Sequence, residues 1–569
     1  MRVEKNGISV HAIAGNRTVL FGMDADADAR RGLLGFAFGR KTDDRVRWMR
    51  GFKFFEATAA DPRPGERRTT EDHPIQSFQW GDYSVDPGSR RDYVVKAVYG
   101  TPTALTYGPD IDIAATTYNA PSDSHQVYFN RGAIPSQAFA DRFGNAGPTV
   151  EETADPDNAK TAWLSRGLLE AALAYIGQAR GPAFELRVAA YEFYYKPILL
   201  ALKRAAQRGA VVRISFDGGD QRRDGTIRAS SISTENLAKI AEYGLDAEPT
   251  LSLHPRTMFS KIPHNKFIVL LRNGVPEQVW TGSTNFTPSG FLGQSNVGHV
   301  VREPSAAAAY NTYWEAISKD PATRGFKDFN TAIFPGPVGD IPPDSLVPVF
   351  SPRRRGMLEW YAGMLEQAAE SAMFTAAFGV ARPLAEKFAA DRDFLRFLLM
   401  ERRDRNPETM ELLERDRDTR IALGSGLNSW AIRLKLDGHA LDAWFKAEEH
   451  FRTQGHIFYI HTKYMLLDAL SDDPKLFTGS ANFSAPSVEG NDENMILMRG
   501  PAFKRVAEVY ATEFMRLFNH LYFRTVVLRR ARAGIGAQKG VAMLDPTDGW
   551  VARHFRTGSY HDRKRKLFR

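Results

Sequence analysis

The feature of this 569-residue sequence that most constrains its fold is an internal repeat. A His-x-Lys triplet on an apolar, strand-like run is followed by Thr-Gly-Ser-x-Asn, and the whole pattern occurs twice. In both copies the serine lies 19 residues and the asparagine 21 residues after the histidine. Equal spacing of so many polar residues indicates a duplicated structural unit with a duplicated site. The residues concerned are His264, Lys266, Ser283 and Asn285 in the first copy and His461, Lys463, Ser480 and Asn482 in the second.

Each copy gathers groups that suit a phosphodiester substrate. Residues two apart on a strand share one face, so the His and Lys of one copy project together, and a hairpin return can bring the Ser and Asn beside them. Two copies related by pseudo-symmetry place two imidazoles face to face. One can attack phosphorus while the other protonates the leaving oxygen, and the Lys, Asn and Ser donors stabilise the phosphoryl charge. These donors supply the electrophile, so we expect neither a metal nor a cofactor.

The two motifs resemble those of the phospholipase D superfamily, whose signature is His-x-Lys-x4-Asp followed by Gly-Ser-x-Asn, present twice in a two-lobed chain. The resemblance covers about residues 150–525 and implies two α/β lobes with one shared site, a covalent phosphohistidine intermediate and turnover without metal. It implies that His264 and His461 are the nucleophile and general acid pair, with His264, in the first half, as the nucleophile. It also implies a set of phosphate ligands, Lys266, Lys463, Asn285 and Asn482, assisted by Ser283 and Ser480.

The two halves differ at two positions. Asp468 fills the family's aspartate position in the second motif, where that residue usually supports a turn, whereas Leu271 stands in the first. The Asn273-Gly274 pair that follows is a strong hairpin signal, so we expect the first motif to remain competent. Glu493, 32 residues after His461, is a candidate to hold the other ring nitrogen of that histidine. The matching stretch 294–296 has no carboxylate, which predicts that His461 is the more readily protonated histidine and the general acid.

The pattern of apolar residues predicts an α/β protein with an additional β domain. Short alternating runs separated by Gly, Pro and Asp clusters predict an N-terminal β-sandwich over residues 1–120. Alternating helical and strand-like segments then predict two pseudo-symmetric phospholipase D-like α/β lobes, 121–340 and 341–545, each with one His-x-Lys motif. We interpret residues 546–569 as a basic C-terminal tail. Because both motifs lie in one chain, a monomer is sufficient to build the site.

The distribution of charge guides the substrate prediction. The formal net charge is +8, and residues 551–569 carry seven basic side chains against the single Asp562, a balance of +6. We expect a separable tail that binds an anionic surface through Arg563, Lys564, Arg565 and Lys566, and nucleic acid as the partner and substrate of a nuclease. Two alternatives stay open. One is a phospholipase D or transphosphatidylase acting on phospholipid, and the other is an inactive nucleic-acid-binding scaffold.

Composition excludes some chemistry and bears on location. The chain has no cysteine, so disulfides and thiolate catalysis are excluded. We identify no signal peptide, and no run approaches the roughly 18 apolar residues of a membrane span. We therefore expect a cytoplasmic protein, with signal-independent secretion as the alternative.

Overall fold

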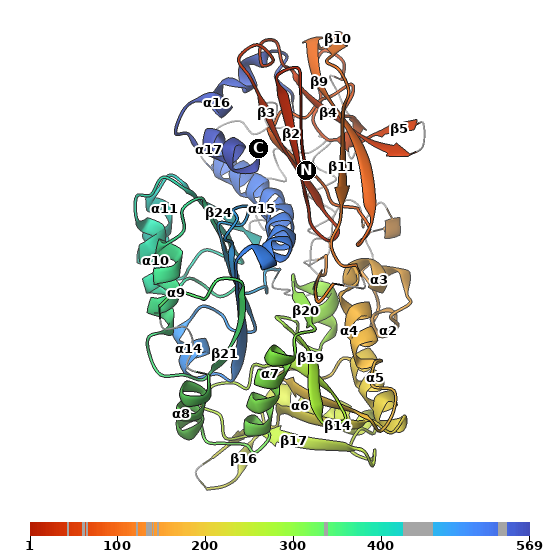
Figure 1. The fold of residues 1–569 in the computed structure, drawn as a ribbon, viewed down its shortest axis with the longest axis vertical. Helices are drawn as coiled ribbons and strands as arrows, with labels where there is room; N and C mark the ends of the chain where they lie inside the picture. The colour runs from red at the N-terminus through yellow and green to blue at the C-terminus, as the bar shows by residue number, and fades with distance from the viewer. Residues whose placement is uncertain are drawn as a thin grey trace.

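The computed structural model describes residues 1–569 except 43–44, 60–62, 64–65, 121–122, 132–138, 140–141, 145–146, 223, 335–338, 425–458 and 533–542, and the side chains of 527–532. Two antiparallel N-terminal sheets stand above two α/β lobes, and a long helix, α15 (Lys504–Arg532), runs between these parts (Figure 1). The expected fold class, two phospholipase D-like α/β lobes preceded by a β-sandwich, is confirmed.

The N-terminal β domain consists of two sheets that bury a shared core. Alternation of buried and less buried residues along its strands turns one face of each sheet inward, as a half-buried strand requires. Phe21, Phe36 and Val95 are among the side chains that fill the space between the sheets. The first sheet has the order β1 (Arg2–Lys5), β2 (Ile8–Ala14), β3 (Val19–Ala25) and β8 (Gln79–Asp82). The second has β10 (Ala104–Tyr107), β9 (Arg90–Thr101), β4 (Gly35–Thr42) and β5 (Arg45–Trp48), with β11 (Ile111–Thr116) also on β9, and a short ribbon pairs β6 (Arg50–Gly51) with β7 (Arg68–Thr69).

Lobe 1 is built on a seven-stranded mixed sheet. Its strand order is β12 (His125–Phe129), β20 (Val297–Val301), β19 (Val275–Gly282), β18 (Lys266–Arg272), β13 (Phe184–Ala190), β14 (Val211–Asp217) and β17 (Leu251–Arg256). The short pair β15 (Asp220–Gln221) and β16 (Ile227–Arg228) lies outside it. The helical segments are α2 (Val150–Ala154), α3 (Ala159–Ser165), α4 (Leu168–Ile176), α5 (Lys196–Gln207), α6 (Ser231–Glu242), η1 (Ser289–Gly293), α7 (Pro304–Ile317) and α8 (Thr323–Ile333).

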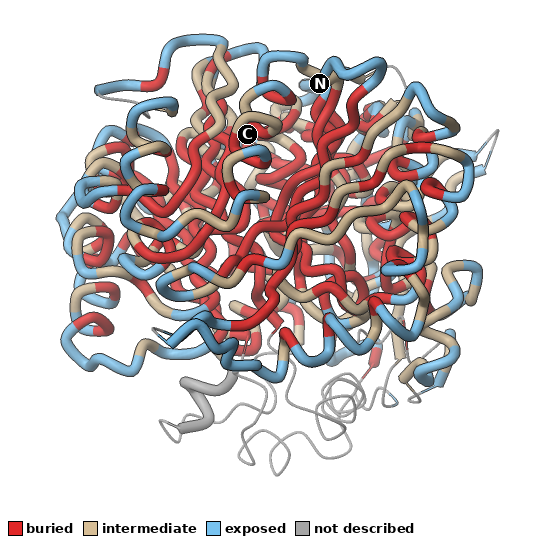
Figure 2. The backbone as a smooth tube through the Cα atoms, turned by 90° about the horizontal axis from the view of Figure 1, so that it is seen from below, coloured by how far each residue is buried: buried red, intermediate tan, exposed pale blue. Residues whose placement is uncertain are grey.

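Lobe 2 repeats this sheet strand for strand. The order is β21 (Ser345–Ser351), β27 (Glu493–Arg499), β26 (Lys475–Gly479), β25 (Tyr464–Leu467), β22 (Ser371–Ala376), β23 (Leu395–Met400) and β24 (Thr419–Leu423). The last three strands of both sheets are parallel to one another. The helical segments are α9 (Met357–Glu366), α10 (Arg382–Ala389), α11 (Pro407–Arg415), α14 (Ala485–Glu489), η3 (Pro501–Phe503) and α15. The lobes share a core that passes through the middle of the molecule, where buried residues dominate (Figure 2).

The basic C-terminal segment is folded, so the expectation of a free tail is wrong. It forms η4 (Asp548–Trp550), α16 (Ala552–Phe555) and α17 (Tyr560–Phe568), and α17 lies against β3 (Figure 1). Phe568 is fully buried, and other aromatic side chains of the segment pack on the β domain. Trp550, for example, stacks on Phe78 at 5.3 Å between ring centroids.

The four basic side chains proposed to bind an anionic surface contact groups of the protein itself. Arg565 pairs with Asp24 and with Asp562, the latter at 2.8 Å, and Lys566 pairs with Asp562 at 2.9 Å. Arg563 lies 2.6 Å from Asp393 and 3.1 Å from Asp418, and Lys564 donates to the Asn519 side chain at 3.0 Å. The charge of this segment is therefore largely compensated within the fold.

One buried carboxylate ties the three parts of the molecule together. Glu513 on α15 is fully buried and accepts hydrogen bonds from Thr18 of the β domain (2.9 Å), from Arg166 of lobe 1 (2.8 Å to each oxygen) and from Arg516 (2.7 Å). Burial alone would raise the pKa of this carboxyl, but the charges and hydrogen bonds of Arg166 and Arg516 overcome burial and lower it from 4.5 to about 2. Because this carboxyl has a lower pKa in the folded protein than in the unfolded chain, it stabilises the folded state at pH values above its unfolded-state pKa.

We expect Glu513→Gln to reduce the free energy of unfolding at pH 7 by about 3–5 kcal/mol, because it leaves buried guanidinium charge without its partner. The contribution of Glu513 should be complete above about pH 4.5 and be lost as the pH falls toward about 2, so the variant's stability should depend less on pH in that window. Urea unfolding across this pH range tests both points. Glu359→Gln, at an exposed position on α9, is the matched control. Equal pH profiles for wild type and Glu513→Gln would contradict the assignment.

Candidate functional site

The two motifs meet at the interface between the lobes and line a single cavity of about 500 Å³. His264 lies just before β18 and His461 just before β25, the corresponding strands of the two sheets. Backbone contacts join the lobes at this point, including a hydrogen bond from the Asp492 amide to the Ile262 carbonyl at 3.1 Å. Four of the residues singled out in the sequence line the cavity together, namely His264, His461, Asn285 and Asn482.

The orienting partner of His264 comes from the other lobe. Its Nδ1 lies 2.9 and 3.0 Å from the two carboxylate oxygens of Glu493, the first residue of β27. The sequence assigned Glu493 to His461, and that assignment is wrong because the carboxylate crosses the interface. Burial raises the pKa of Glu493 to about 7, against the opposing charge of Lys266. Burial, with the charges of Lys266 and Lys463, also holds the pKa of His264 well below its usual value.

The partner of His461 also comes from the other lobe, and it is an amide. His461 Nδ1 lies 2.8 Å from Oδ1 of Asn296 in lobe 1. The orientation of this amide is set by two further bonds, since Ser283 donates to the same oxygen at 2.8 Å and Asn296 Nδ2 donates to the Gly290 carbonyl at 2.9 Å. Burial is again the main reason that the pKa of His461 is far below its usual value. The carboxylate support predicted for His461 therefore belongs to His264, so the reason for expecting His461 to be the more readily protonated histidine does not hold.

The two lysines are nearly fully buried beside the histidines of their own motifs. Lys266 Nζ donates to the His264 carbonyl at 2.6 Å, and Lys463 Nζ donates to the His461 carbonyl. Each ammonium also lies over an aromatic ring, Tyr191 at 5.5 Å and Phe378 at 5.8 Å. Burial lowers the pKa of Lys266 to about 8 and that of Lys463 well below its usual value.

The motif serines and glycines hold the segments that carry the histidine partners. Ser283 accepts from the Val297 amide at 3.1 Å, and Ser480 accepts from the Asn494 amide at 3.0 Å. Both serines are fully buried, and neither lines the cavity. A Cβ at Gly282 or Gly479 would lie 2.2 Å from a carbonyl oxygen of the adjacent strand, so only glycine allows this close approach.

The position where the motifs differ serves a turn in lobe 2, whereas in lobe 1 Leu271 is buried within β18. Asp468 accepts hydrogen bonds from the backbone amides of 369–371 at 2.7–3.1 Å, and it does not line the cavity. In lobe 1 the Asn273-Gly274 pair has φ values of 50° and 79° and connects β18 to β19. The predicted hairpin is therefore confirmed.

Sequence reasoning did not single out two features of this cavity. Glu192, just after β13, accepts a hydrogen bond from Asn285, and burial raises its pKa. The corresponding strand of lobe 2 is followed by Phe378, which lines the cavity with 58% of its surface exposed. Glu192 and Phe378 thus occupy equivalent positions, each two residues after its strand, and an alignment of the two halves over β13 and β22 could have shown this difference.

A buried ion pair locks the lobes next to Glu493. Arg256 at the end of β17 donates from Nε to Asp492 at 2.8 Å, and both side chains are 1% exposed. A second guanidinium nitrogen lies 2.6 Å from Asp320. This pair fixes the start of β27, the strand that carries the partner of His264.

Searches for other ligand-binding or membrane features found little in the part of the chain that the structure describes. Its residues include no group of three or more His, Asp or Glu side chains arranged to hold a metal ion. None of its helices has the length and hydropathy needed to cross a membrane.

Comparison with known proteins identifies the class of this two-lobed α/β fold. The family model described as "Cardiolipin synthase, PLD-like domain" matches residues 173–318 and 410–518, which contain the two motifs. The two matched segments are therefore phospholipase D-like, and the resemblance seen in the sequence is confirmed. The sequence has no significant match among curated proteins.

Several solved structures are similar to the chain at low identity. Phosphatidylserine synthase from Haemophilus influenzae is 13% identical with a TM-score of 0.41, over 67% of this chain and 94% of that one. Nuc, a phospholipase D family member from Salmonella typhimurium, is 23% identical with a TM-score of 0.22, over 34% and 94%. Polyphosphate kinase from Porphyromonas gingivalis is 11% identical with a TM-score of 0.36, over 59% of this chain but only 44% of the kinase.

The exchange of partners predicts a selective response of each histidine to its neighbour. Asn296→Asp places a carboxylate against His461 Nδ1 and should raise the pKa of His461 by about 1–3, while His264 changes little. Glu493→Gln should lower the pKa of His264 and leave that of His461 nearly unchanged. NMR titration with ¹⁵N-labelled histidine measures both. A change at His264 in response to Asn296→Asp would show that the partners are not exchanged.

Proposed function

We propose that the chain is a phosphodiesterase in which His264 forms a covalent phosphohistidine and His461 acts as the general acid, with nucleic acid as the substrate. The observation that carries the proposal is the exchange of partners across the interface. Because each Nδ1 proton is held by the opposite lobe, each Nε2 is left for chemistry in the shared cavity.

The difference between the two partners supports the assignment of roles. When His264 Nε2 bonds to phosphorus, its ring becomes positively charged, and the Glu493 carboxylate stabilises that charge. The Asn296 amide is neutral and stabilises a protonated His461 less, which favours release of its proton to the leaving oxygen. In the second step neutral His461 takes a proton from water, the water oxygen bonds to phosphorus, and the P–N bond to His264 breaks.

Cationic and amide groups near the histidines can stabilise the phosphoryl oxygens. Lys266 and Lys463 contribute charge within this largely buried site, where charge acts strongly. Asn285 and Asn482 line the cavity and supply amide donors. Glu192 accepts a hydrogen bond from Asn285, and the equivalent position of lobe 2, two residues after β22, is Phe378 rather than a carboxylate.

The surroundings of the cavity favour nucleic acid over phospholipid. Tyr191 and the exposed Phe378 offer aromatic faces for bases, and Lys261 adds a positive charge at the lining. Large exposed apolar side chains among the described residues are scattered over several elements, whereas a lipid enzyme needs a continuous apolar surface. The description of the matched family model includes cardiolipin synthase, so phospholipid is the competing substrate in the test.

Cleavage assays in EDTA test this proposal. We expect cleavage of single-stranded or double-stranded nucleic acid by the wild type, a loss of about 10²–10⁴-fold in His461→Ala and at least as large a loss in His264→Ala. A ³²P-labelled substrate should leave a covalent label on the wild type and on His461→Ala, but not on His264→Ala. His254→Ala, on β17 outside the cavity, serves as the matched control.

Three results would contradict the proposal. Labelling of His264→Ala but not His461→Ala would reverse the roles of the histidines. Headgroup release from phospholipid vesicles, without cleavage of nucleic acid, would indicate that the substrate is a phospholipid. A strict requirement for a divalent cation would reject the mechanism.

A further inference from the structure

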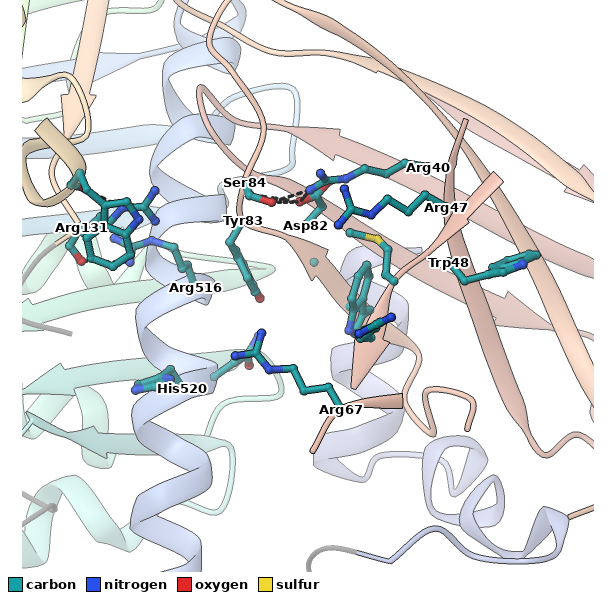
Figure 3. A pocket seen from close by; sticks show the side chains of 16 residues that line it. Arg40, Arg47, Trp48, Arg67, Asp82, Tyr83, Ser84, Arg131, Arg516 and His520 are labelled. Atoms are coloured by element: carbon teal, nitrogen blue, oxygen red, sulfur yellow. Dashed lines mark hydrogen bonds and ion pairs between the residues drawn. The ribbon is translucent and has the colours of Figure 1, made fainter. Parts of the chain in front are cut away.

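A second cavity, of about 740 Å³, lies between the β domain and helix α15, separate from the cavity that His264 and His461 line. It shares no lining residue with the histidine cavity. Figure 3 shows that its labelled side chains come from two walls, with Arg40 and Arg47 extending from the β domain toward the side on which Arg131 and Arg516 lie. We call it the arginine pocket after its arginine lining residues, Arg40, Arg47, Arg50, Arg67, Arg131 and Arg516.

The arginine pocket has more positive charge than its own carboxylates compensate. Asp82 is the one acidic side chain among the described lining residues, and it is bound to Arg40 at 2.8 Å (Figure 3). Arg47 and Arg50 are exposed, and no carboxylate of the described residues pairs with either. An anion that enters the pocket therefore meets two guanidinium groups, those of Arg47 and Arg50, that have no carboxylate partner among the described residues.

The wall of the pocket that contains Arg131 and Arg516 also has an excess of positive charge. Arg516 shares Glu513 with Arg166, and Arg131 is bound through Nε to the Trp163 carbonyl at 2.7 Å rather than to a carboxylate. Burial and the nearby charges of Arg166 and Arg516 lower the pKa of Arg131 to about 9. The positive charge on this wall is therefore electrostatically unfavourable, and a bound anion would reduce this unfavourable energy.

Aromatic rings stand among these arginines. The Arg131 guanidinium lies over the Trp163 ring at 4.0 Å from its centroid, and Trp48, Trp80 and Tyr83 also line the pocket. Guanidinium groups bind phosphate through paired N–H donors, and aromatic faces stack on bases. Both kinds of group, combined in a space of this size, suit a ligand that carries a phosphate next to a planar ring.

We propose that the arginine pocket binds a nucleotidyl group, either as a free nucleotide or as part of a single strand of nucleic acid. The binding does not depend on the reaction proposed for the histidine cavity. It assigns a role to the β domain, which supplies one wall of the pocket through β4, β5 and β8.

A chain of hydrogen bonds leads from this pocket to His461. Arg516 donates to the carbonyls of Asn130 (3.2 Å) and Arg131 (3.1 Å). The Asn130 side-chain oxygen accepts a hydrogen bond from the backbone N–H of Asn296 at 2.9 Å. The side chain of the same asparagine holds His461 Nδ1. A ligand that draws Arg516 toward the pocket changes the anchoring of Asn130, so its binding should also alter the NMR signals of His461.

Binding of defined probes to the full chain tests the proposal. The protein carries His264→Ala, which prevents cleavage at the proposed nucleophile, and is titrated in EDTA with a fluorescent 12-residue oligothymidylate, with ATP, and with vesicles of phosphatidylglycerol in phosphatidylcholine. The pocket variant is Arg47→Ala with Arg50→Ala, both at exposed positions. The matched control is Arg354→Ala with Arg355→Ala, which removes equal charge from exposed positions outside the pocket. Melting curves verify that both double variants fold.

We expect the pocket variant to bind the oligonucleotide about tenfold or more weakly for each arginine removed, with a salt dependence reduced by about 2 in slope, and the control to bind as the parent does. Competition by ATP, with the same loss of ATP binding in the pocket variant, identifies a free nucleotide as a sufficient ligand. Binding of the strand without ATP competition identifies the strand as the ligand. Equal oligonucleotide and ATP binding by the pocket variant and the control overturns the proposal, as does a pocket variant that loses only vesicle binding. Failure of the wild type to cleave nucleic acid would refute the proposed function and leave these binding results unchanged.

Discussion

The exchange of histidine partners across the lobe interface is the constraint on which the site depends. Each lobe supplies the partner of the other lobe's motif imidazole, because Glu493 of lobe 2 holds His264 and Asn296 of lobe 1 holds His461. Any sliding of the lobes would separate both rings from their partners at once. The shared aromatic core and the buried Arg256–Asp492 pair oppose such movement, which explains why strong interactions are concentrated around this cavity.

The sequence predicted the two lobes and the composition of the site because both are repeated at equal spacing. Spacing along the chain does not reveal which lobe supplies a partner, so Glu493 was assigned to the nearer histidine. The sequence did not indicate Asn296 as a partner, because the side chain expected at that position was a carboxylate and not an amide. Charge was misread for a similar reason, since composition counts Arg565 as positive whether or not Asp24 and Asp562 neutralise it. Ion pairing depends on tertiary contacts between distant residues.

Helix α15 gives the β domain a fixed place relative to the lobes. Glu513 receives donors from the β domain, from lobe 1 and from its own helix, and the wall of the arginine pocket that contains Arg516 is part of the same helix. The pocket consequently exists only in the assembled molecule, because neither the β domain nor a lobe contains all its walls. The β domain thereby contributes to a surface that the lobes alone lack.

The contact between α17 and β3 has a consequence for biosynthesis. The carbonyl of Phe568 lies so close to Gly22 that a Cβ at that glycine would be 1.8 Å from its oxygen. Strand β3 leaves the ribosome early, yet its outer surface remains uncovered until more than 500 further residues have been translated. The nascent β domain must therefore stay soluble with part of its packing surface exposed, a period in which chaperones can bind it. Helix α17 thus covers a sheet whose strand β3 precedes it by more than 500 residues in the sequence.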